Sequence, residues 1–501
     1  MKLGIDLGTT RTIVALVDRG NYPVVSFTDP DGDPVDHFPS VVARRGDQLV
    51  YGFAAERAAA EGALLVRSFK RDLASGSIAG QTTIDIDGLE VGLLEVVTGF
   101  LAALAEELRT ASNIATLLGD DEPLEAVVAV PAHAHSAQRF LTLEAFRRAG
   151  FHVLGMLNEP SAAGFEFTHR QPRSVNSRRT RVVVYDLGGG TFDASLVRVD
   201  DLSHEVVTSV GINRLGGDDF DEVLGRLAQR EVGSRVELTG REQASLLDEC
   251  RVAKENLSPQ SKRIALEVGH APVVVDVADF YAEATPLVEA SLDALEPLLG
   301  GLDGYQLEAA EVAGIYLVGG ASSLPLVARV LRERFGRRVH RSPHPAASTA
   351  IGLAIAADET SGFHLTDRLS RGFGVFREWD SGALLAFDPI LDRDQRTSPD
   401  DTVVVRRQYR PVHNIGVFRF LEYAALGESG QPTGDVVPLG EVLFPFDPAL
   451  RDVADLDEVA VERTGEGPLI EETYVIDRHG IVTAAISDLE AGFTLSSRFG
   501  G

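Results

Sequence analysis

Two short stretches that repeat one pattern decide the fold. Residues 3–10 are LGIDLGTT, and residues 183–191 are VVYDLGGGT. In each copy an apolar run enters Asp-Leu-Gly, and a second apolar run follows, at 12–17 and at 192–197. The two copies lie about 180 residues apart, a spacing that predicts two similar halves facing one another.

Each copy reads as a strand, a glycine-rich turn and a second strand. Such a turn lets backbone N–H groups converge on an anion, because no Cβ blocks the approach. Asp6 and Asp186, which open the turns, suit a hydrated Mg²⁺ between carboxylates and phosphate oxygens. None of the four lysines follows a glycine, so a Walker-type loop is excluded. The pair of turns predicts a nucleotide-phosphate site with a metal position.

Composition excludes several classes of partner. The chain has 501 residues, 47 Lys and Arg, 75 Asp and Glu, and a net charge of −28. That charge argues against nucleic acid and against anionic membranes as partners. A lone Cys250 excludes an internal disulfide and a multi-cysteine zinc site. With no signal peptide and no apolar run of about 18 residues, we expect a soluble, cytoplasmic protein.

The chain changes character once. Residues 1–357 alternate β-branched runs with Ala/Leu/Glu-rich helical stretches, which predicts an α/β domain. Residues 369–501 show short alternating runs separated by Gly, Pro and Asp, which predicts an all-β domain. Residues 358–368 are the expected linker. A further element at 315–325 predicts a strand that ends in Gly319 and Gly320 before a helix.

These motifs resemble the actin, sugar kinase and heat-shock ATPase superfamily and, within it, the heat shock protein 70 chaperones of the DnaK type. The closer resemblance rests on NEPSAA at 158–163, LGGDDFD at 215–221 and AKENLS at 253–258. It continues more weakly at 438–441 and 474–481. It implies an actin-like (ribonuclease H-like) duplicated ATPase domain followed by a β-sandwich that binds substrate. Because the sequence stops at Gly501, we expect the family's helical lid to be absent.

The resemblance also implies roles for individual residues. Lys70 matches the family's catalytic lysine, which orients the water that attacks the γ-phosphate, and Glu159 matches an acidic residue that transmits nucleotide state. Asp6, Asp186 and Asp193 would hold Mg²⁺, with K⁺ as a further candidate ion. Asp186 and Thr191 complete the expected catalytic set. The residues expected to bind ATP or ADP are Gly8, Thr9, Thr10, Gly188, Gly189, Gly190, Gly216, Gly217, Lys254, Ser258, Gly319 and Gly320.

The chain departs from the family where that family contacts adenosine. Arg251 replaces an acidic residue, Ser323 replaces an arginine that stacks on adenine, and Ala346 replaces an acid. We therefore expect tight binding of the triphosphate but poor discrimination of adenine from other bases, unless Glu255 or another side chain supplies a substitute contact. The linker is also atypical, since 362–365 is GFHL rather than acidic and leucine-rich.

Three functions fit these motifs. The leading hypothesis is a stress-response chaperone, a slow Mg²⁺-dependent ATPase coupled to unfolded or extended peptides and assisted by a J-domain co-chaperone and a nucleotide exchange factor. Phe373 and Phe376 would line its peptide cleft. The second is a nucleotide-responsive scaffold with negligible ATPase activity that serves one partner. The third is a small-molecule kinase, which the motifs at 158–163 and 215–221 and the β domain disfavour.

Overall fold

The computed structural model describes most of the chain. The described residues are 1–74, 82–119, 122–171, 179–233, 238–299, 312–369, 371–379, 384–392, 395–397, 402–427, 429–453 and 455–499. They divide into two compact units. The first comprises Met1–Asp72, Thr83–His133 and Ala145–Leu365, and the second comprises Leu73–Thr82, Ala134–Glu144 and Thr366–Gly501.

Two sheets of the first unit repeat one strand order. One sheet runs β12-β11-β1-β2-β5, and the other contains β19-β18-β13-β14-β15 in corresponding places. In both sheets the central strand pairs antiparallel with the next strand in sequence and parallel with a later one. The strands span Lys2–Leu7 (β1), Arg11–Leu16 (β2), Phe38–Pro39 (β5), Leu124–Val130 (β11), Phe151–Asn158 (β12), Arg181–Leu187 (β13), Phe192–Asp200 (β14), Ser203–Ile212 (β15), Val312–Val318 (β18) and Val339–Arg341 (β19). The internal repeat predicted from the sequence is confirmed.

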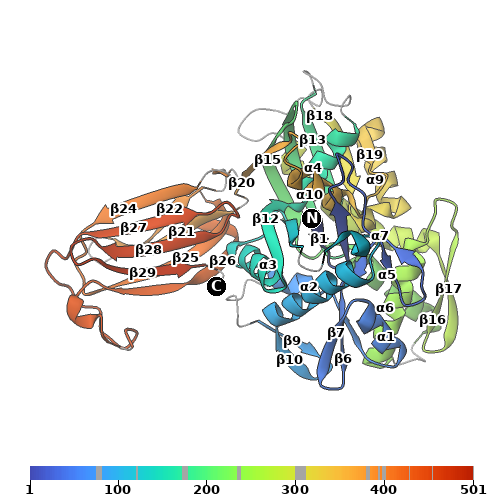
Figure 1. Ribbon diagram of the computed structural model, residues 1–501, viewed down its shortest axis with the longest axis horizontal. Helices are drawn as coiled ribbons and strands as arrows, with labels where there is room; N and C mark the ends of the chain where they lie inside the picture. The colour runs from blue at the N-terminus through green and yellow to red at the C-terminus, as the bar shows by residue number, and fades with distance from the viewer. Residues whose placement is uncertain are drawn as a thin grey trace. The chain divides into compact units, whose positions relative to one another are not determined.

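The helix that follows each sheet packs on the other sheet. Helix α4 (Glu159–Arg170) follows β12, yet its Phe167 is buried against Val184 of β13. Helix α10 (Ser348–Ala357) follows β19, yet its Ala350 is buried with Ile13 of β2. The two helices lie side by side (Figure 1). A Cβ on Gly352 of α10 would stand 1.7 Å from the carbonyl oxygen of Ala162 in α4, so this crossing is backbone against backbone.

Further helices and small sheets cover the outer faces of the first unit. An aromatic cluster that includes Phe38, Phe69 and Phe100 fills the first half, and a larger aliphatic core underlies α5, α7 and α9 in the second. The helices of this unit span Phe53–Ala60 (α1), Leu93–Thr110 (α2), Gly217–Val232 (α5), Gly240–Glu255 (α6), Val277–Ala294 (α7), Glu296–Leu299 (α8) and Pro325–Phe335 (α9). Most of Ser136–Arg148 (α3) belongs to the second unit. The small sheets use Phe27–Thr28 (β3) with Pro34–Val35 (β4), Val41–Arg45 (β6) with Gln48–Tyr51 (β7) and Leu65–Arg67 (β8), Thr83–Ile86 (β9) with Leu89–Gly92 (β10), and Arg263–Val268 (β16) with Ala271–Asp276 (β17).

The second unit is built around two antiparallel sheets, ordered β22-β21-β25-β26 and β24-β27-β28-β29. Figure 1 shows these strands in orange to red. They span Gly372–Trp379 (β21), Leu384–Leu391 (β22), Val403–Tyr409 (β24), Ile415–Leu426 (β25), Pro432–Pro445 (β26), Ile470–Ile476 (β27), Val482–Asp488 (β28) and Phe493–Arg498 (β29). Short strands at His364–Arg368 (β20) and Arg396–Thr397 (β23) pair with each other. The predicted fold class, an α/β part followed by a β-sandwich, is confirmed.

One prediction about the sandwich is wrong. Phe373 is 1% exposed and stacks on Phe420 with ring centroids 5.8 Å apart, so it belongs to the core and lines no cleft. Phe376, on the opposite face of the strand, is half-buried against Phe387. The sequence alternation placed the two rings correctly on a strand. It did not reveal which face of that strand meets the second sheet.

A buried ion pair also lies in the sandwich. Arg377 donates two hydrogen bonds to the carboxylate of Glu472, at 2.9 and 2.8 Å, and Tyr474 donates a third at 2.5 Å. Glu472 is fully buried, so these donors compensate the cost of removing its charge from water.

None of the described helices in the chain has both the length and the apolar character needed to cross a membrane.

Candidate active site

The two repeated turns lie face to face in the first unit. A Cβ on Gly189 would stand 2.8 Å from the side chain of Thr10, and one on Gly190 would stand 2.8 Å from the side chain of Thr9. Glycine at these positions therefore lets the two turns approach to direct contact. Loop backbone from both halves converges at this point, as an anion site built from two turns requires.

The second turn is fixed by the start of α5. The backbone N–H of Gly217 donates to Gly188 O at 2.9 Å, and that of Asp218 donates to Gly189 O at 2.8 Å. Gly216 packs so closely that a Cβ there would stand 2.6 Å from the nitrogen of Gly190. The motif at 215–221 thus shapes the turn at 188–191.

A cavity of about 380 Å³ opens beside these turns. That volume falls in the range of small-molecule sites. Its wall includes both turns, Lys70, Glu159, the helix α6 and the segment after β18. The lining residues are Asp6, Gly8, Thr9, Thr10, Arg11, Ile13, Lys70, Glu159, Asp186, Gly188, Gly189, Thr191, Gly217, Asp218, Asp221, Arg251, Lys254, Glu255, Asn256, Gly319, Gly320, Ala321, Ser323, Leu324, Pro345, Ala346 and Thr349.

Lys70 and Glu159 form an ion pair in the wall of this cavity. Lys70 Nζ donates to Glu159 Oε1 at 2.6 Å, and each side chain is 10% exposed. Burial acts to lower the pKa of Lys70, but Glu159 and Asp6 outweigh it, and the lysine pKa is raised. Lys70 is therefore held as a cation that faces the pocket.

The chain around Lys70 explains why this side chain points inward. Ser68 has a left-handed backbone (φ 59°), and its hydroxyl donates to Asp218 Oδ2 at 2.7 Å. The 3₁₀ helix η1 (Phe69–Ala74) begins directly after it, and Phe69 is buried. Arg71 donates to the carbonyl of Gly190 at 2.7 Å and pairs with Asp219 at 3.1 Å. Neighbours on both sides of Lys70 thus attach this segment to the second turn.

Three of the carboxylates that line the pocket, those of Asp6, Glu159 and Asp186, interact with the charge of Lys70. Burial raises the pKa of Asp6 to about 7, with Glu159 adding to the shift and Lys70 opposing it. Burial and the charges of Glu159 and Asp6 also raise the pKa of Asp186. A divalent cation beside these carboxylates would favour their charged forms, so the group suits such an ion.

The described residues hold no group of three His, Cys, Asp or Glu side chains arranged to ligate a metal directly. Ligation through water from Asp6 and Asp186 needs no such group, because Mg²⁺ usually keeps several waters. Asp193, the third predicted metal residue, does not line the cavity. Its buried carboxylate accepts a hydrogen bond from the backbone N–H of Ala132 at 3.2 Å.

The cations on α6 are engaged by neighbouring acids. Lys254 Nζ donates to Gly217 O at 2.6 Å and pairs with Asp221 at 2.6 Å. Burial raises the pKa of Asp221 to about 6, although Lys254 opposes the shift. Arg251 lies between Asp218, Asp221 and Asp248, at 3.5, 3.6 and 3.2 Å. These contacts hold α6 to the start of α5.

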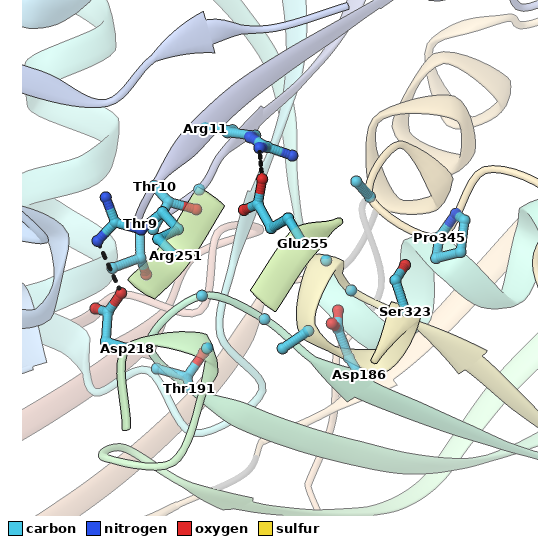
Figure 2. A pocket seen from close by; sticks show the side chains of 18 of the residues that line it. Thr9, Thr10, Arg11, Asp186, Thr191, Asp218, Arg251, Glu255, Ser323 and Pro345 are labelled. Atoms are coloured by element: carbon cyan, nitrogen blue, oxygen red, sulfur yellow. Dashed lines mark hydrogen bonds and ion pairs between the residues drawn. The ribbon is translucent and has the colours of Figure 1, made fainter. Parts of the chain in front are cut away.

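Another ion pair in the pocket wall joins the start of β2 to the end of α6. Arg11, at the start of β2, bonds to Glu255, at the end of α6, and the side chains are 38% and 39% exposed. Figure 2 shows this pair reaching across the pocket, with Ser323 and Pro345 beyond Glu255. Gly319 precedes that wall with a φ of 83°, and a Cβ there would stand 2.3 Å from Asp186 Oδ1.

Most of the predicted site residues line one cavity. The predicted residues that do not line it are Gly190, Asp193, Gly216 and Ser258. Gly190 and Gly216 lie behind the turn they shape, and Ser258 is exposed beyond the end of α6. The expected helix directly after Gly320 is also corrected, since the 3₁₀ turn η3 (Gly320–Ser323) intervenes before α9 begins at Pro325.

Sequence reasoning missed several lining residues, among them Arg11, Asp221 and Pro345. Arg11 directly follows Thr10, so its position beside the first turn was a signal that went unused. Asp221 ends the motif at 215–221 and lies about one turn of α5 after Gly217, so that signal also went unused. Pro345 belongs to none of the quoted motifs.

Comparison with known proteins gives a consistent result. A family model described as Hsp70 protein matches residues 100–381. The Chaperone protein HscA homolog of Tolumonas auensis is 35% identical over 366 residues, which cover 71% of this chain and 57% of that protein. The Chaperone protein DnaK of Mycoplasma mycoides is 26% identical over 502 residues, 97% of this chain and 77% of that protein. The match to the HscA homolog thus spans little more than half of that relative's length.

Proposed function

Because this chain belongs to the Hsp70 family, we propose that it is a chaperone that binds and slowly hydrolyses a nucleoside triphosphate with Mg²⁺ and holds extended peptide segments in its β-sandwich. Members of this family bind ATP and ADP with Mg²⁺. The observation that carries the proposal is the pocket in which two facing turns meet the Lys70–Glu159 pair. J-domain co-chaperones and nucleotide exchange factors are the expected partners.

In this proposal the backbone of the two turns binds the phosphates, and Thr9, Thr10 and Thr191 add hydroxyl donors. Asp6 and Asp186 would hold Mg²⁺ through water. The metal supplies charge neutralisation at the transferring phosphoryl group. Lys70, fixed by Glu159, orients the attacking water and stabilises the developing charge.

The peptide would be held in the second unit by main-chain hydrogen bonds and side-chain pockets. Since Phe373 lies in the core, this proposal no longer relies on it. We expect weak binding of an apolar, extended peptide to the full chain. Fluorescence anisotropy with a labelled hydrophobic heptapeptide measures it, and a heptapeptide with aspartates at its apolar positions is the control.

The test of the enzymatic part is single-turnover hydrolysis with Mg²⁺, with and without that heptapeptide. Slow hydrolysis that the peptide accelerates would support the chaperone. The second candidate is a binding scaffold without turnover, and the altered nucleoside wall, with Arg251 and Ser323, favours it. Nucleotide binding with no measurable hydrolysis, together with no peptide binding at high micromolar protein, would favour the scaffold instead.

A further inference from the structure

The part of the pocket away from the two turns has an unusual chemical character. If the phosphates lie at the turns and Lys70, the nucleoside must lie against the remaining wall. That wall has no aromatic ring among the described lining residues. Glu255 and Asn256 at the end of α6, Ser323 and Pro345 belong to this wall. The backbone of Arg11 adjoins the first turn, and its side chain reaches the wall at Glu255. With no ring for stacking, hydrogen bonds must provide most of the base recognition.

Arg11 and Glu255 have hydrogen-bonding capacity to offer a base. Both side chains are more than one-third exposed, and they reach the pocket from opposite sides. A guanidinium has five N–H donors and a carboxylate about four acceptor positions, so their mutual bond leaves several of each. Arg251 and Lys254 differ, because acids of α5 and α6 already engage them.

A guanidinium beside a carboxylate complements guanine better than adenine. Guanine presents O6 and N7 as acceptors, to which arginine binds through two donors. Its N1–H and N2–H groups are adjacent donors, which suit a carboxylate. Adenine instead offers an acceptor at N1, which a carboxylate repels, and its preferred partner is an Asn or Gln amide.

The wall has one amide, and one of its two N–H donors is already used within α6. Asn256 is the sole Asn or Gln among the described lining residues, and its Nδ2 donates to Val252 O at 2.9 Å at the end of α6. We therefore propose that the pocket prefers guanine nucleotides to adenine nucleotides, with Arg11 and Glu255 as the residues that select the base. This inference rests on the proposed nucleotide-binding function.

Calorimetric titration of the full chain with GDP and with ADP, both with Mg²⁺, tests the proposal. The two ligands share the same phosphates and ribose, so a difference in affinity reports the base. We expect GDP to bind on the order of 10- to 100-fold more tightly. IDP, which lacks the 2-amino group, should bind more weakly than GDP.

The variant Glu255→Gln replaces the carboxylate by the amide that adenine prefers. This variant should bind GDP more weakly and ADP more tightly, so that the ratio of the two affinities falls or reverses. The matched control is Glu61→Gln, which alters an exposed Arg45–Glu61 pair (3.1 Å) outside the pocket and should preserve the preference for GDP. Circular dichroism of both variants confirms folding.

ADP affinity equal to or higher than that of GDP in the unaltered chain would overturn this inference and leave the proposed function standing. An unchanged GDP-to-ADP ratio in Glu255→Gln would overturn the role of Glu255. Binding of neither diphosphate would overturn the proposed function, and this inference with it.

Discussion

Two of the ion pairs in the pocket wall, Lys70–Glu159 and Arg11–Glu255, have similar composition but different surroundings. Lys70 and Glu159 are each 10% exposed, and they share their environment with Asp6 and Asp186. Arg11 and Glu255 are 38% and 39% exposed. A buried pair whose partner is removed leaves an uncompensated charge, whereas an exposed pair loses little because water replaces the partner. The buried ion pair therefore holds Lys70 and Glu159 in place at one end of the pocket. At the other end, Arg11 and Glu255 can exchange their mutual bond for bonds to water or to a ligand.

The largest effect is expected from Lys70→Ala at the buried end. Loss of a cation that acts on the transferring phosphoryl group should reduce the hydrolysis rate by roughly 10²- to 10⁴-fold. Nucleotide affinity should change far less. Single-turnover kinetics beside calorimetry separates the two quantities.

The control is Lys262→Ala, which removes an exposed lysine that does not line the cavity. If Lys70→Ala hydrolyses nucleotide at the parental rate, the buried pair has no part in the chemistry.

An intermediate effect is expected from Gly216→Ala, which acts on the second turn without changing a charge. The added methyl would stand 2.6 Å from Gly190 N and 2.7 Å from Gly189 O. Overpacking of this kind costs about 1–3 kcal/mol, so nucleotide affinity should fall roughly 5- to 150-fold for every base. Titration with GDP and ADP measures both the loss and its independence of the base.

Gly240→Ala is the matched control, because a Cβ there meets nothing within 4 Å. Parental affinity in Gly216→Ala would mean that the start of α5 does not set the turn.

The smallest effect is expected from Arg11→Ala, measured as the free energy of unfolding in urea. An exposed ion pair contributes about 0.2–1 kcal/mol, so the variant should lose less than about 1 kcal/mol. A loss well above that value would show that the Arg11–Glu255 pair holds the two halves together. The proposed difference in stability contribution between the exposed and the buried pair would then be wrong.

The phosphate end of the pocket was largely predictable from the sequence, and the nucleoside end was not. The turns at 3–10 and 183–191 are local sequence patterns. Because the same pattern occurs twice, the sequence also predicts two similar halves whose turns face one another. The contact between Arg11 and Glu255 joins residues 244 positions apart, and neither segment contains a pattern that requires the other. The sequence showed which adenosine-side residues differ from the family and offered Glu255 as a substitute contact, but it gave no indication of Arg11 as the partner of Glu255.

The sandwich shows a similar limit. The resemblance places both Phe373 and Phe376 at the cleft, whereas the two side chains lie on opposite faces of β21. The choice of core face depends on the register of the partner sheet, where Tyr474 and Phe499 contact Phe373. No single strand carries that information.

The crossing of α4 and α10 has a mechanical consequence. Two helices that touch backbone to backbone, at Gly352 and Ala162, can rotate about the contact, but sliding would drive one main chain into the other. At 1.5 Å per residue, this pivot lies about 4.5 Å from the Glu159 end of α4 and about 12 Å from its Arg170 end. A tilt of α4 about this contact would therefore move its Arg170 end more than twice as far as its Glu159 end.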